Sequence, residues 1–131
     1  MNTVNDVKII ELNTLKNLTA IEFSDKIPFE VKRIFYVKDI DSLDKRGCHA
    51  HYKTKQVLIC INGAIECICK DSSGNEVSYL LDSPNKGLYV PEMIWDEQIY
   101  NSKDSILLSL SSTNYDPKDY INNIEDFYEN L

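Results

Sequence analysis

The two histidines of the chain, His49 and His51, are the side chains whose type and spacing point most directly to chemistry. They stand in the segment 46–51, which reads Arg-Gly-Cys-His-Ala-His. Successive side chains of an extended strand point to opposite faces, so the two imidazoles share one face and Cys48 and Ala50 lie behind them. Two histidines on a polar surface edge would have the same spacing, so the pattern alone leaves both interpretations open.

A His-x-His pair can begin a metal site, but the rest of such a site is missing. Gln56 stands where a carboxylate would complete the ligand set, and the chain has no third histidine. A catalytic divalent metal usually has three good protein ligands, which two imidazoles and an amide do not supply. The four cysteines, at positions 48, 60, 67 and 69, match no metal or redox spacing. The sequence therefore disfavours a metal.

Proton transfer suits the histidine pair better. A neutral imidazole accepts a proton near pH 7 and its conjugate acid returns it. Two such groups on one face fit a reaction that removes a proton from one carbon and restores it at the next. Arg33 and Arg46 would hold an anionic part of the substrate, because guanidinium groups match phosphate oxygens. Tyr36 would polarise a carbonyl or orient an imidazole.

The side chains proposed to act with the histidines also have purely structural interpretations. Arg33 fits a solvated strand position, and Tyr36 fits a core aromatic. Trp95, the single tryptophan, fits either the core or a stacking wall of a pocket. The residues by themselves leave these alternatives open.

Short β-branched segments separated by turn signals must position these side chains. Strands are expected at residues 7–12, 31–37, 56–61, 64–70, 76–81, 88–90 and 105–111. Asn62-Gly63, between two of these segments, is a strong hairpin signal. Strands at regular intervals with short turns predict an all-β fold, an antiparallel sandwich or barrel.

One helix is expected at the end of the chain. Asp116 is a suitable N-cap, with Pro117 at the first helical position. From Tyr120 to Leu131, apolar residues recur at three- and four-residue steps and form one stripe.

Length and charge exclude several classes of protein. The 131 residues fit a single domain with an ordinary core. A net charge of −7 argues against a general nucleic-acid binder. No apolar run approaches the ~18 residues that span a bilayer, so no membrane association is expected. The first residues lack the pattern of a signal peptide, which predicts a cytoplasmic location with reduced cysteines.

Five strings along the chain resemble the sugar 3,4-ketoisomerase family, WxcM-like cupins similar in fold to the dTDP-sugar epimerases. The strings are Arg33-Ile-Phe-Tyr36, Arg46-Gly-Cys-His49-Ala-His51, Gln56-Val-Leu-Ile-Cys60-Ile-Asn-Gly63, Gly87-Leu-Tyr-Val-Pro91 with Trp95, and Tyr115-Asp-x2-Asp119-Tyr120-Ile121. The resemblance runs from about residue 7 to residue 131. Glu92 departs from the pattern, since a second proline is expected after Pro91.

The resemblance implies a cupin, that is, an all-β jelly-roll barrel with a short C-terminal helix. It implies an enzyme that converts dTDP-4-keto-6-deoxy-D-glucose to a dTDP-3-keto-6-deoxyhexose through an enediol(ate). No metal or other cofactor is expected, and the product would serve the synthesis of 3-amino sugars for surface glycans. The resemblance also implies a homodimer that exchanges N-terminal strands, which would give residues 7–12 a partner.

The roles implied for the site are specific. His49 is the expected base and His51 the second acid/base or orienting partner, while Tyr36 stabilises the developing oxyanion. The residues expected to bind the substrate or line its pocket are Arg33, Arg46, Gln56 and Trp95.

Three alternatives remain open. A dTDP-sugar 3,5-epimerase shares the fold but would also act at C5 and leave the ketone at C4. A non-catalytic sugar-binding cupin would bind the nucleotide sugar without exchanging its hydrogen. A metal-dependent oxygenase would require a bound metal.

Overall fold

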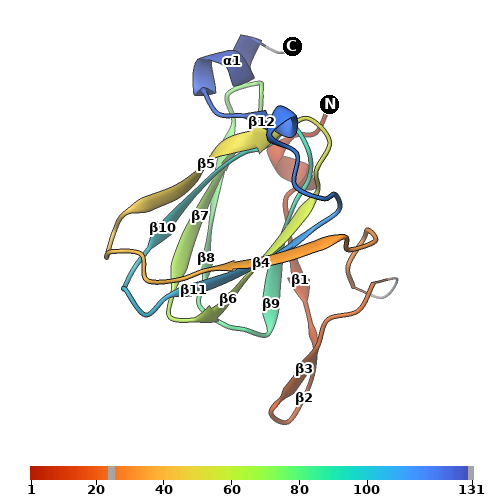
Figure 1. The fold of residues 1–131 in the computed structure, drawn as a ribbon, viewed down its shortest axis with the longest axis vertical. Coiled ribbons are helices and arrows are strands. Elements are labelled where there is room, and N and C mark those ends of the chain that lie inside the picture. The colour runs from red at the N-terminus through yellow and green to blue at the C-terminus, as the bar shows by residue number, and fades with distance from the viewer. Residues whose placement is uncertain (24–25, 130–131) are drawn as a thin grey trace.

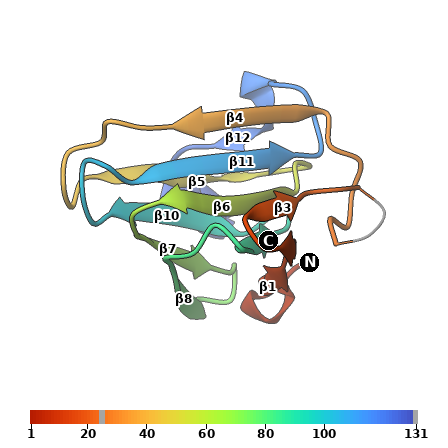
Figure 2. The same cartoon turned by 90° about the horizontal axis from the view of Figure 1, so that it is seen from below.

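Two five-stranded antiparallel sheets pack face to face (Figure 1, Figure 2). The computed structural model describes residues 1–23 and 26–129. The first sheet has the spatial order β1 (Lys8–Glu11), β9 (Lys86–Val90), β6 (Gln56–Asn62), β11 (Ile106–Ser111) and β4 (Arg33–Val37). The second sheet has the order β12 (Tyr120–Ile121), β5 (Lys45–His51), β10 (Trp95–Tyr100), β7 (Ile65–Lys70) and β8 (Glu76–Leu81). This arrangement confirms the predicted all-β jelly roll.

The register of the first sheet shows which of its side chains share the inner face. Gln56 lies opposite Ser111, and Ser111 lies opposite Arg33. Directly opposite residues of antiparallel strands lie on the same face, so these three form one polar row. The two following rows are mostly apolar and consist of Leu58, Ser109 and Phe35, and of Cys60, Leu107 and Val37.

The turn at Asn62-Gly63 does not form the predicted hairpin. It joins β6 to β7, but the two strands belong to different sheets, so the chain crosses from one layer to the other. The backbone of Gly63 has φ +80°, and a Cβ there would lie 2.5 Å from Ser105 Oγ. The same hydroxyl accepts a hydrogen bond from the Ala64 backbone N–H over 3.2 Å. Contact with this distant serine, which local sequence does not reveal, directs the crossing.

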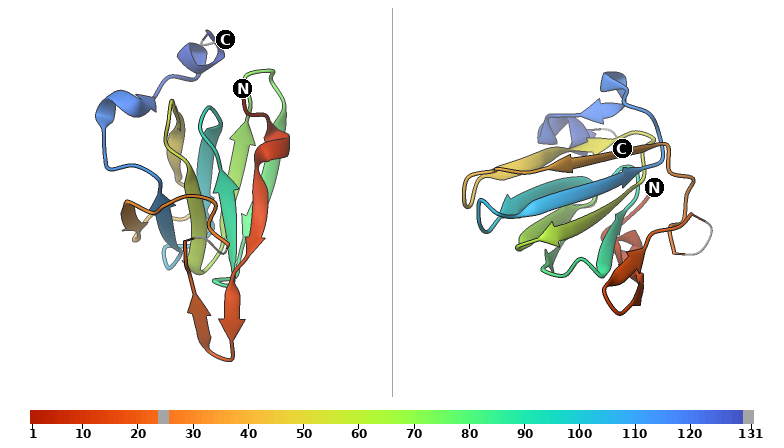
Figure 3. Two further views of the ribbon diagram at one scale, coloured as in Figure 1. Left: turned by 90° about the vertical axis from the view of Figure 1, so that its right-hand side faces the viewer. Right: turned by 60° about the horizontal axis from the view of Figure 1, so that its bottom comes forward.

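The N-terminal segment pairs within its own chain. Strand β1 lies antiparallel to β9, and Val7 and Leu12 on either side of it are buried. Exchange of this strand between the subunits of a dimer, as expected for residues 7–12, stays a prediction. The hairpin of β2 (Asn13–Leu15) and β3 (Leu18–Ala20) follows and projects away from the two sheets (Figure 1, Figure 3).

The C-terminal segment contains less helix than predicted. Asp116 does act as a cap, accepting from the Lys118 N–H, but it caps the short 3-10 helix η2 (Pro117–Asp119). Tyr120 and Ile121 then pair with β5 as strand β12, and the helix α1 spans only Ile124–Glu129. The last residue of the predicted stripe, Leu131, lies outside the described residues. Pairing with β5 thus replaces the first turns of the expected helix.

Apolar side chains fill the space between the sheets and a second space beneath α1. All four cysteines are free thiols, and Cys60, Cys67 and Cys69 are part of the core between the sheets. The cluster beneath α1 contains Ala50, Trp95, Ile121 and Phe127. None of the helices in the described part of the chain is long and apolar enough to cross a membrane.

Candidate active site

A cavity of about 220 Å³ opens between the two sheets and contains most of the predicted site residues. Strands β4, β6 and β11 supply one wall, and β5, β10 and β12 supply the other. The side chains and backbone that line it belong to Arg33, Phe35, Val37, Arg46, Gly47, His49, Gln56, Leu58, Gln98, Leu107 and Tyr120. Its lining combines apolar walls with a few polar groups, which is typical of small-molecule sites.

A β-bulge in β5 brings Arg46 and His49 to the same face. These residues are three apart, so regular alternation would send their side chains to opposite faces. The pairing with β10 shifts at this point, because Asp96 pairs with His49 but Glu97 pairs with Gly47, which leaves Cys48 as the extra residue. Gly47 and Cys48 both have positive φ, +75° and +59°. A Cβ at Gly47 would lie 3.1 Å from Gln98 Nε2, so this position favours glycine on both counts.

The environment of His49 leaves one ring nitrogen free to act as a base. Its Nδ1 atom lies 3.1 Å from the Gly47 carbonyl oxygen. A carbonyl oxygen only accepts, so Nδ1 carries the hydrogen and Nε2 keeps its lone pair. Burial lowers the pKa of His49 below 6.5, and the bond to Gly47 opposes that effect. His49 is therefore neutral at pH 7 and presents an unprotonated nitrogen in the cavity wall.

His51 lies behind His49 and is more deeply buried. The ring centroids of the two histidines are 4.9 Å apart. Burial, and after it the neighbouring His49, lower the pKa of His51 to about 4, although Asp119 opposes both effects. His51 Nδ1 lies 3.4 Å from Asp119 Oδ2, but neither ring nitrogen has a well-aligned hydrogen bond among the described residues. The nearby carboxylate therefore raises the pKa of the imidazole without forming a well-aligned hydrogen bond to it.

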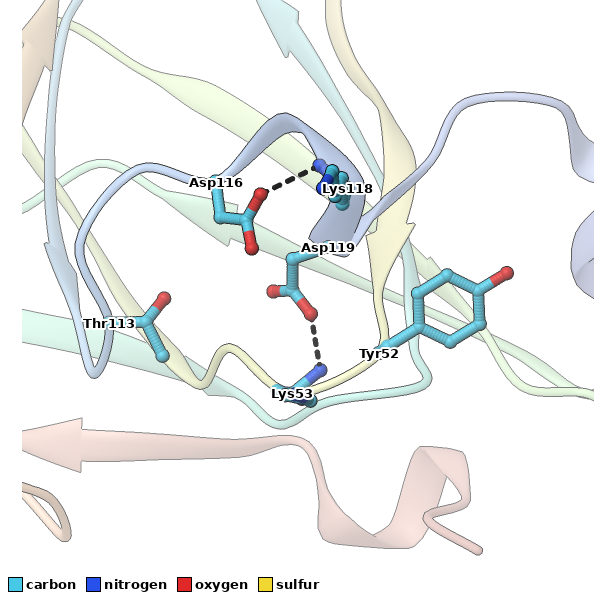
Figure 4. A pocket seen from close by; sticks show the side chains of 6 residues that line it. All are labelled: Tyr52, Lys53, Thr113, Asp116, Lys118 and Asp119. Atoms are coloured by element: carbon cyan, nitrogen blue, oxygen red, sulfur yellow. Dashed lines mark hydrogen bonds between the residues drawn. The ribbon is translucent and has the colours of Figure 1, made fainter.

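Asp119 is held by the loop that follows β5. Its carboxylate accepts from the backbone N–H of Lys53 over 2.8 Å and from that of Thr54 over 3.2 Å. The Thr54 hydroxyl also donates to Oδ2 of Asp119. Figure 4 shows the carboxylate pointing toward Lys53 in a surface pocket of about 270 Å³. Asp119 thus lies between the buried His51 and this polar pocket.

Tyr120 contacts both histidines. Its ring centroid lies 4.9 Å from that of His49 and 4.4 Å from that of His51. Strand β12 sets this position, because Tyr120 pairs directly with His51. Tyr120 is the phenol that faces the cavity in the described part of the chain.

The two arginines reach the cavity from opposite walls. Arg33 of β4 places its guanidinium carbon 4.5 Å from the ring centroid of Phe35 and 5.1 Å from that of Tyr115. Arg46 of β5 is exposed at the other wall. Gln56 shares the row of Arg33 and is buried. The structure therefore brings Arg33, Arg46 and Gln56 together with His49, as the predicted site requires.

The donor atoms around the cavity do not form an evident metal centre. No group of three or more histidine, cysteine, aspartate and glutamate side chains among the described residues is arranged to hold a metal ion.

Comparison with known proteins shows the family. The chain matches the FdtA family, described as WxcM-like, C-terminal, over residues 3–131. The chain belongs to the FdtA family. Among its relatives is a protein of Aneurinibacillus thermoaerophilus named TDP-4-oxo-6-deoxy-alpha-D-glucose-3,4-oxoisomerase. The two are 41% identical over 125 residues, which are 95% of this chain and 87% of that protein.

Solved structures of similar proteins have the same fold. QdtA, a sugar 3,4-ketoisomerase of Thermoanaerobacterium thermosaccharolyticum in complex with TDP, matches with a TM-score of 0.89 and 35% identity over 94% of this chain and 92% of that one. A variant of QdtA was solved in complex with TDP-4-keto-6-deoxyglucose. WlaRB, a TDP-quinovose 3,4-ketoisomerase of Campylobacter jejuni, also has a TM-score of 0.89, with 36% identity over 95% of this chain and 98% of that one.

Tyr36 does not lie in the cavity of this FdtA-family chain. It is 66% exposed on the outer face of β4, and the inward positions of that strand are Arg33, Phe35 and Val37. Strand alternation gives the reason, because residues 33 and 36 cannot share a face of a regular strand. We therefore correct the prediction for Tyr36. Phe35 occupies the wall there, and Tyr120 is the phenol beside the histidines.

Trp95 is also displaced from its predicted place. It is buried against Phe127 of α1, with ring centroids 5.9 Å apart, and its Nε1–H donates to Glu97 Oε2 over 2.9 Å. It precedes the inward-facing Asp96 by one residue, so its side chain points to the other face of β10. Trp95 is therefore part of the core beneath α1 and does not line the cavity.

Three polar residues of the site were not predicted as such. Asp119 and Tyr120 stood in a string that carried the family resemblance, but they were placed at the start of a helix without a role. Gln98 was not singled out, because no strand was expected from the sequence at residues 95–100, where the structure has β10. All three depend on the pairing of β10 and β12 with β5.

Proposed function

We propose that this protein is a nucleotide-sugar 3,4-ketoisomerase that converts dTDP-4-keto-6-deoxy-D-glucose to a dTDP-3-keto-6-deoxyhexose. The observation that carries the proposal is the position of His49 in the wall of a cavity large enough for a hexose, with its Nδ1 3.1 Å from the Gly47 carbonyl oxygen so that Nε2 is left as the basic nitrogen. The names of the relatives QdtA and WlaRB support the same reaction and a thymidine nucleotide.

The first step is removal of the hydrogen on C3. The neighbouring C4 ketone acidifies this hydrogen, and His49 Nε2 takes the proton while the C3–H electron pair forms the C3–C4 double bond. The C4 oxygen becomes an enediolate oxygen. A neutral base is required here, and desolvation, which keeps the pKa of His49 low, supplies one at pH 7.

The second step returns a proton to C4. The C3 hydroxyl proton moves to the C4 oxygen, the C3–O bond becomes the new ketone, and the double-bond electrons take the proton from the His49 imidazolium. One proton has moved from C3 to C4 and one from O3 to O4, so the reaction consumes no co-reactant. Tyr120 lines the cavity beside His49 and would pass the proton between the oxygens, and His51 behind them would act as the second acid/base or orient the other two rings.

The arginines give the site a positive mouth in a chain of negative net charge. Arg33 and Arg46 would bind the diphosphate, because local charge rather than net charge decides what a pocket attracts. Gln56 would contact the sugar or nucleotide from the row of Arg33. In this proposal proton transfer needs no metal or organic cofactor.

A homodimer is part of the proposal. The outer face of the first sheet carries an apolar groove lined by Ile21, Phe23, Glu30, Val31, Ile34, Leu108 and Leu110. Ile34 is 63% exposed there, and a second copy of the chain would cover it. Sedimentation analysis of the purified chain tests this, and a monomer at micromolar concentration would contradict it. The cytoplasmic location and the role in 3-amino sugar synthesis stay predictions.

A proton NMR time course in D₂O tests the reaction. The protein is added to dTDP-4-keto-6-deoxy-D-glucose, and we expect loss of the H3 signal and growth of a 3-keto product. A sugar that binds with no loss of H3 would instead indicate a binding protein. Exchange at C5 with the ketone retained at C4 would indicate an epimerase. Loss of turnover after treatment with a chelator, restored by a divalent metal, would overturn the metal-free mechanism.

A further inference from the structure

Gln98 places an amide among the apolar walls of the cavity. It is 6% exposed, and it lies opposite Arg46 in the pairing of β10 with β5. Phe35, Leu58 and Leu107 line the same cavity and offer only carbon. The proposed proton transfer gives Gln98 no part, so its polar group requires another explanation.

Two neighbours on the same strand fix the orientation of this amide. Gln98 Nε2 donates to Asp96 Oδ2 over 2.6 Å, and the Tyr100 hydroxyl donates to Gln98 Oε1 over 3.3 Å. Asp96, Gln98 and Tyr100 alternate along β10, so all three point inward. The amide is therefore held in one orientation before any ligand arrives.

The fixed amide keeps unused hydrogen-bonding capacity. A glutamine side chain has two N–H donors and a carbonyl oxygen with two lone pairs, and the two bonds to Asp96 and Tyr100 use one of each. Buried polar groups without partners are costly, so a ligand that supplies one is favoured. A hydroxyl group both donates and accepts and meets this need.

We propose that Gln98 binds the C2 hydroxyl of the sugar and makes the enzyme selective for 2-hydroxylated hexoses. This inference rests on the proposed function. In the substrate, C1 carries the diphosphate, C3 and C4 exchange oxidation state, and C6 is a methyl group. The C2 hydroxyl is the one that stays unchanged from substrate to product, so a fixed partner can hold it throughout the reaction.

Asp96 is the positioning residue for this contact. Its carboxyl group lies directly beneath Gly47, because a Cβ at that glycine would come within 3.3 Å of Asp96 Oδ2. The glycine thus leaves room for Asp96 to reach Gln98. Asp96 acts on the sugar only through the amide that it holds.

The test compares the substrate with its 2-deoxy analogue by initial rates of H3 loss in D₂O. We expect the wild-type protein to use the analogue with a kcat/KM roughly 10-fold or more lower, because the amide loses its partner. Gln98→Met has a similar volume and no hydrogen bonds. It should lower kcat/KM for the natural substrate more than for the analogue, so that the ratio between the two sugars falls toward one. Equal wild-type rates on the two sugars, or equal losses on both in Gln98→Met, would overturn the inference.

Two Asp96 variants separate positioning from packing. Asp96→Asn keeps an acceptor for Gln98 Nε2 and should retain the discrimination between the sugars. Asp96→Leu removes the acceptor and should lose the discrimination between the two sugars. The melting temperature of this variant shows whether it is folded. If both variants retain full discrimination, Asp96 does not position the amide. If Gln98→Met does not fold, the wild-type comparison still decides whether the C2 hydroxyl is recognised.

The isomerase activity and the Gln98 contact can be refuted independently of each other. A wild-type protein that leaves H3 of the natural substrate in place refutes the isomerase activity. Calorimetric affinities of the same two sugars then still test Gln98, because recognition of the C2 hydroxyl does not require turnover. Equal affinities in that case would overturn the Gln98 contact as well.

Discussion

The Nδ1 atom of His51 lies 3.4 Å from the Oδ2 atom of Asp119, which the backbone of Lys53 and Thr54 holds in place. The contact joins the end of β5 to the 3-10 helix that leads into β12. It therefore couples the position of the inner histidine to the docking of the C-terminal segment. Tyr120, the next residue, reaches the cavity through the same connection.

Asp119→Asn is expected to lower both stability and turnover. The amide replaces one of two accepting oxygens with a donor, so at least one of the bonds from Lys53, Thr54 or the Thr54 hydroxyl is lost. A buried bond to a carboxylate contributes about 1–3 kcal/mol, which should appear in urea unfolding. Turnover should fall roughly 10-fold as His51 and Tyr120 lose their fixed positions.

Asp116→Asn is the matched control for that variant. Asp116 is exposed in the same surface pocket (Figure 4), and its Oδ1 accepts from the Lys118 N–H over 3.0 Å. Asparagine caps as well as aspartate, so stability and turnover should stay near those of the wild type. If stability and turnover fell equally in the two variants, Asp119 would contribute only to the structure of the local loop.

Strand alternation predicted the relative positions of the two histidines and would have corrected the position predicted for Tyr36. It placed His49 and His51 on one face with Cys48 and Ala50 behind them, and the structure has them so. The same rule separates Arg33 from Tyr36 on one strand. The sequence therefore held the signal that Tyr36 and Arg33 cannot both line one cavity.

Other features of the site depend on contacts that local sequence does not encode. Gly47 hints at a bulge, but the positive φ of Cys48 arises only because β5 must stay paired with β10. The apolar spacing after Asp116 is compatible with a helix. Pairing of Tyr120 with His51 outweighs that local preference, and only the assembled sheet offers the partner.

His49→Asn should abolish most of the activity. Asparagine retains polarity and approximate size but offers no basic nitrogen at Nε2. We expect turnover of dTDP-4-keto-6-deoxy-D-glucose, measured by NMR, to fall roughly 10²-fold or more. The affinity for the nucleotide sugar should change little. Near-normal loss of the H3 signal would reject His49 as the base.

Tyr120→Phe and Tyr36→Phe should have opposite outcomes. Removing the hydroxyl of Tyr120 takes away the phenol that lies beside both imidazoles, and we expect turnover to fall roughly 10-fold or more. Tyr36 is exposed on the outer face, so its loss of a hydroxyl should leave kcat within about 2-fold of the wild type. The reverse result would restore the catalytic role first predicted for Tyr36.

Trp95→Phe should reduce stability while sparing catalysis. The variant loses the bond from Nε1 to Glu97 and part of the packing against Phe127. We expect the free energy of unfolding to fall by about 1–3 kcal/mol in urea titrations, with kcat/KM within about 3-fold of the wild type. A large rise in KM at unchanged stability would instead support the substrate-binding role predicted from sequence.

The pH dependence of stability should report the buried histidines. Burial lowers the pKa of His51 to about 4, whereas an unfolded histidine titrates near 6.5. Between these values the unfolded chain binds more protons than the folded one, so the free energy of unfolding must fall as the pH drops below 6.5. A shift of this size corresponds to about 3 kcal/mol, lost progressively down to pH 4. In urea titrations, the free energy of unfolding of His51→Asn should decline less steeply over this pH range. A decline as steep as that of the wild type would show that His51 is not the residue responsible.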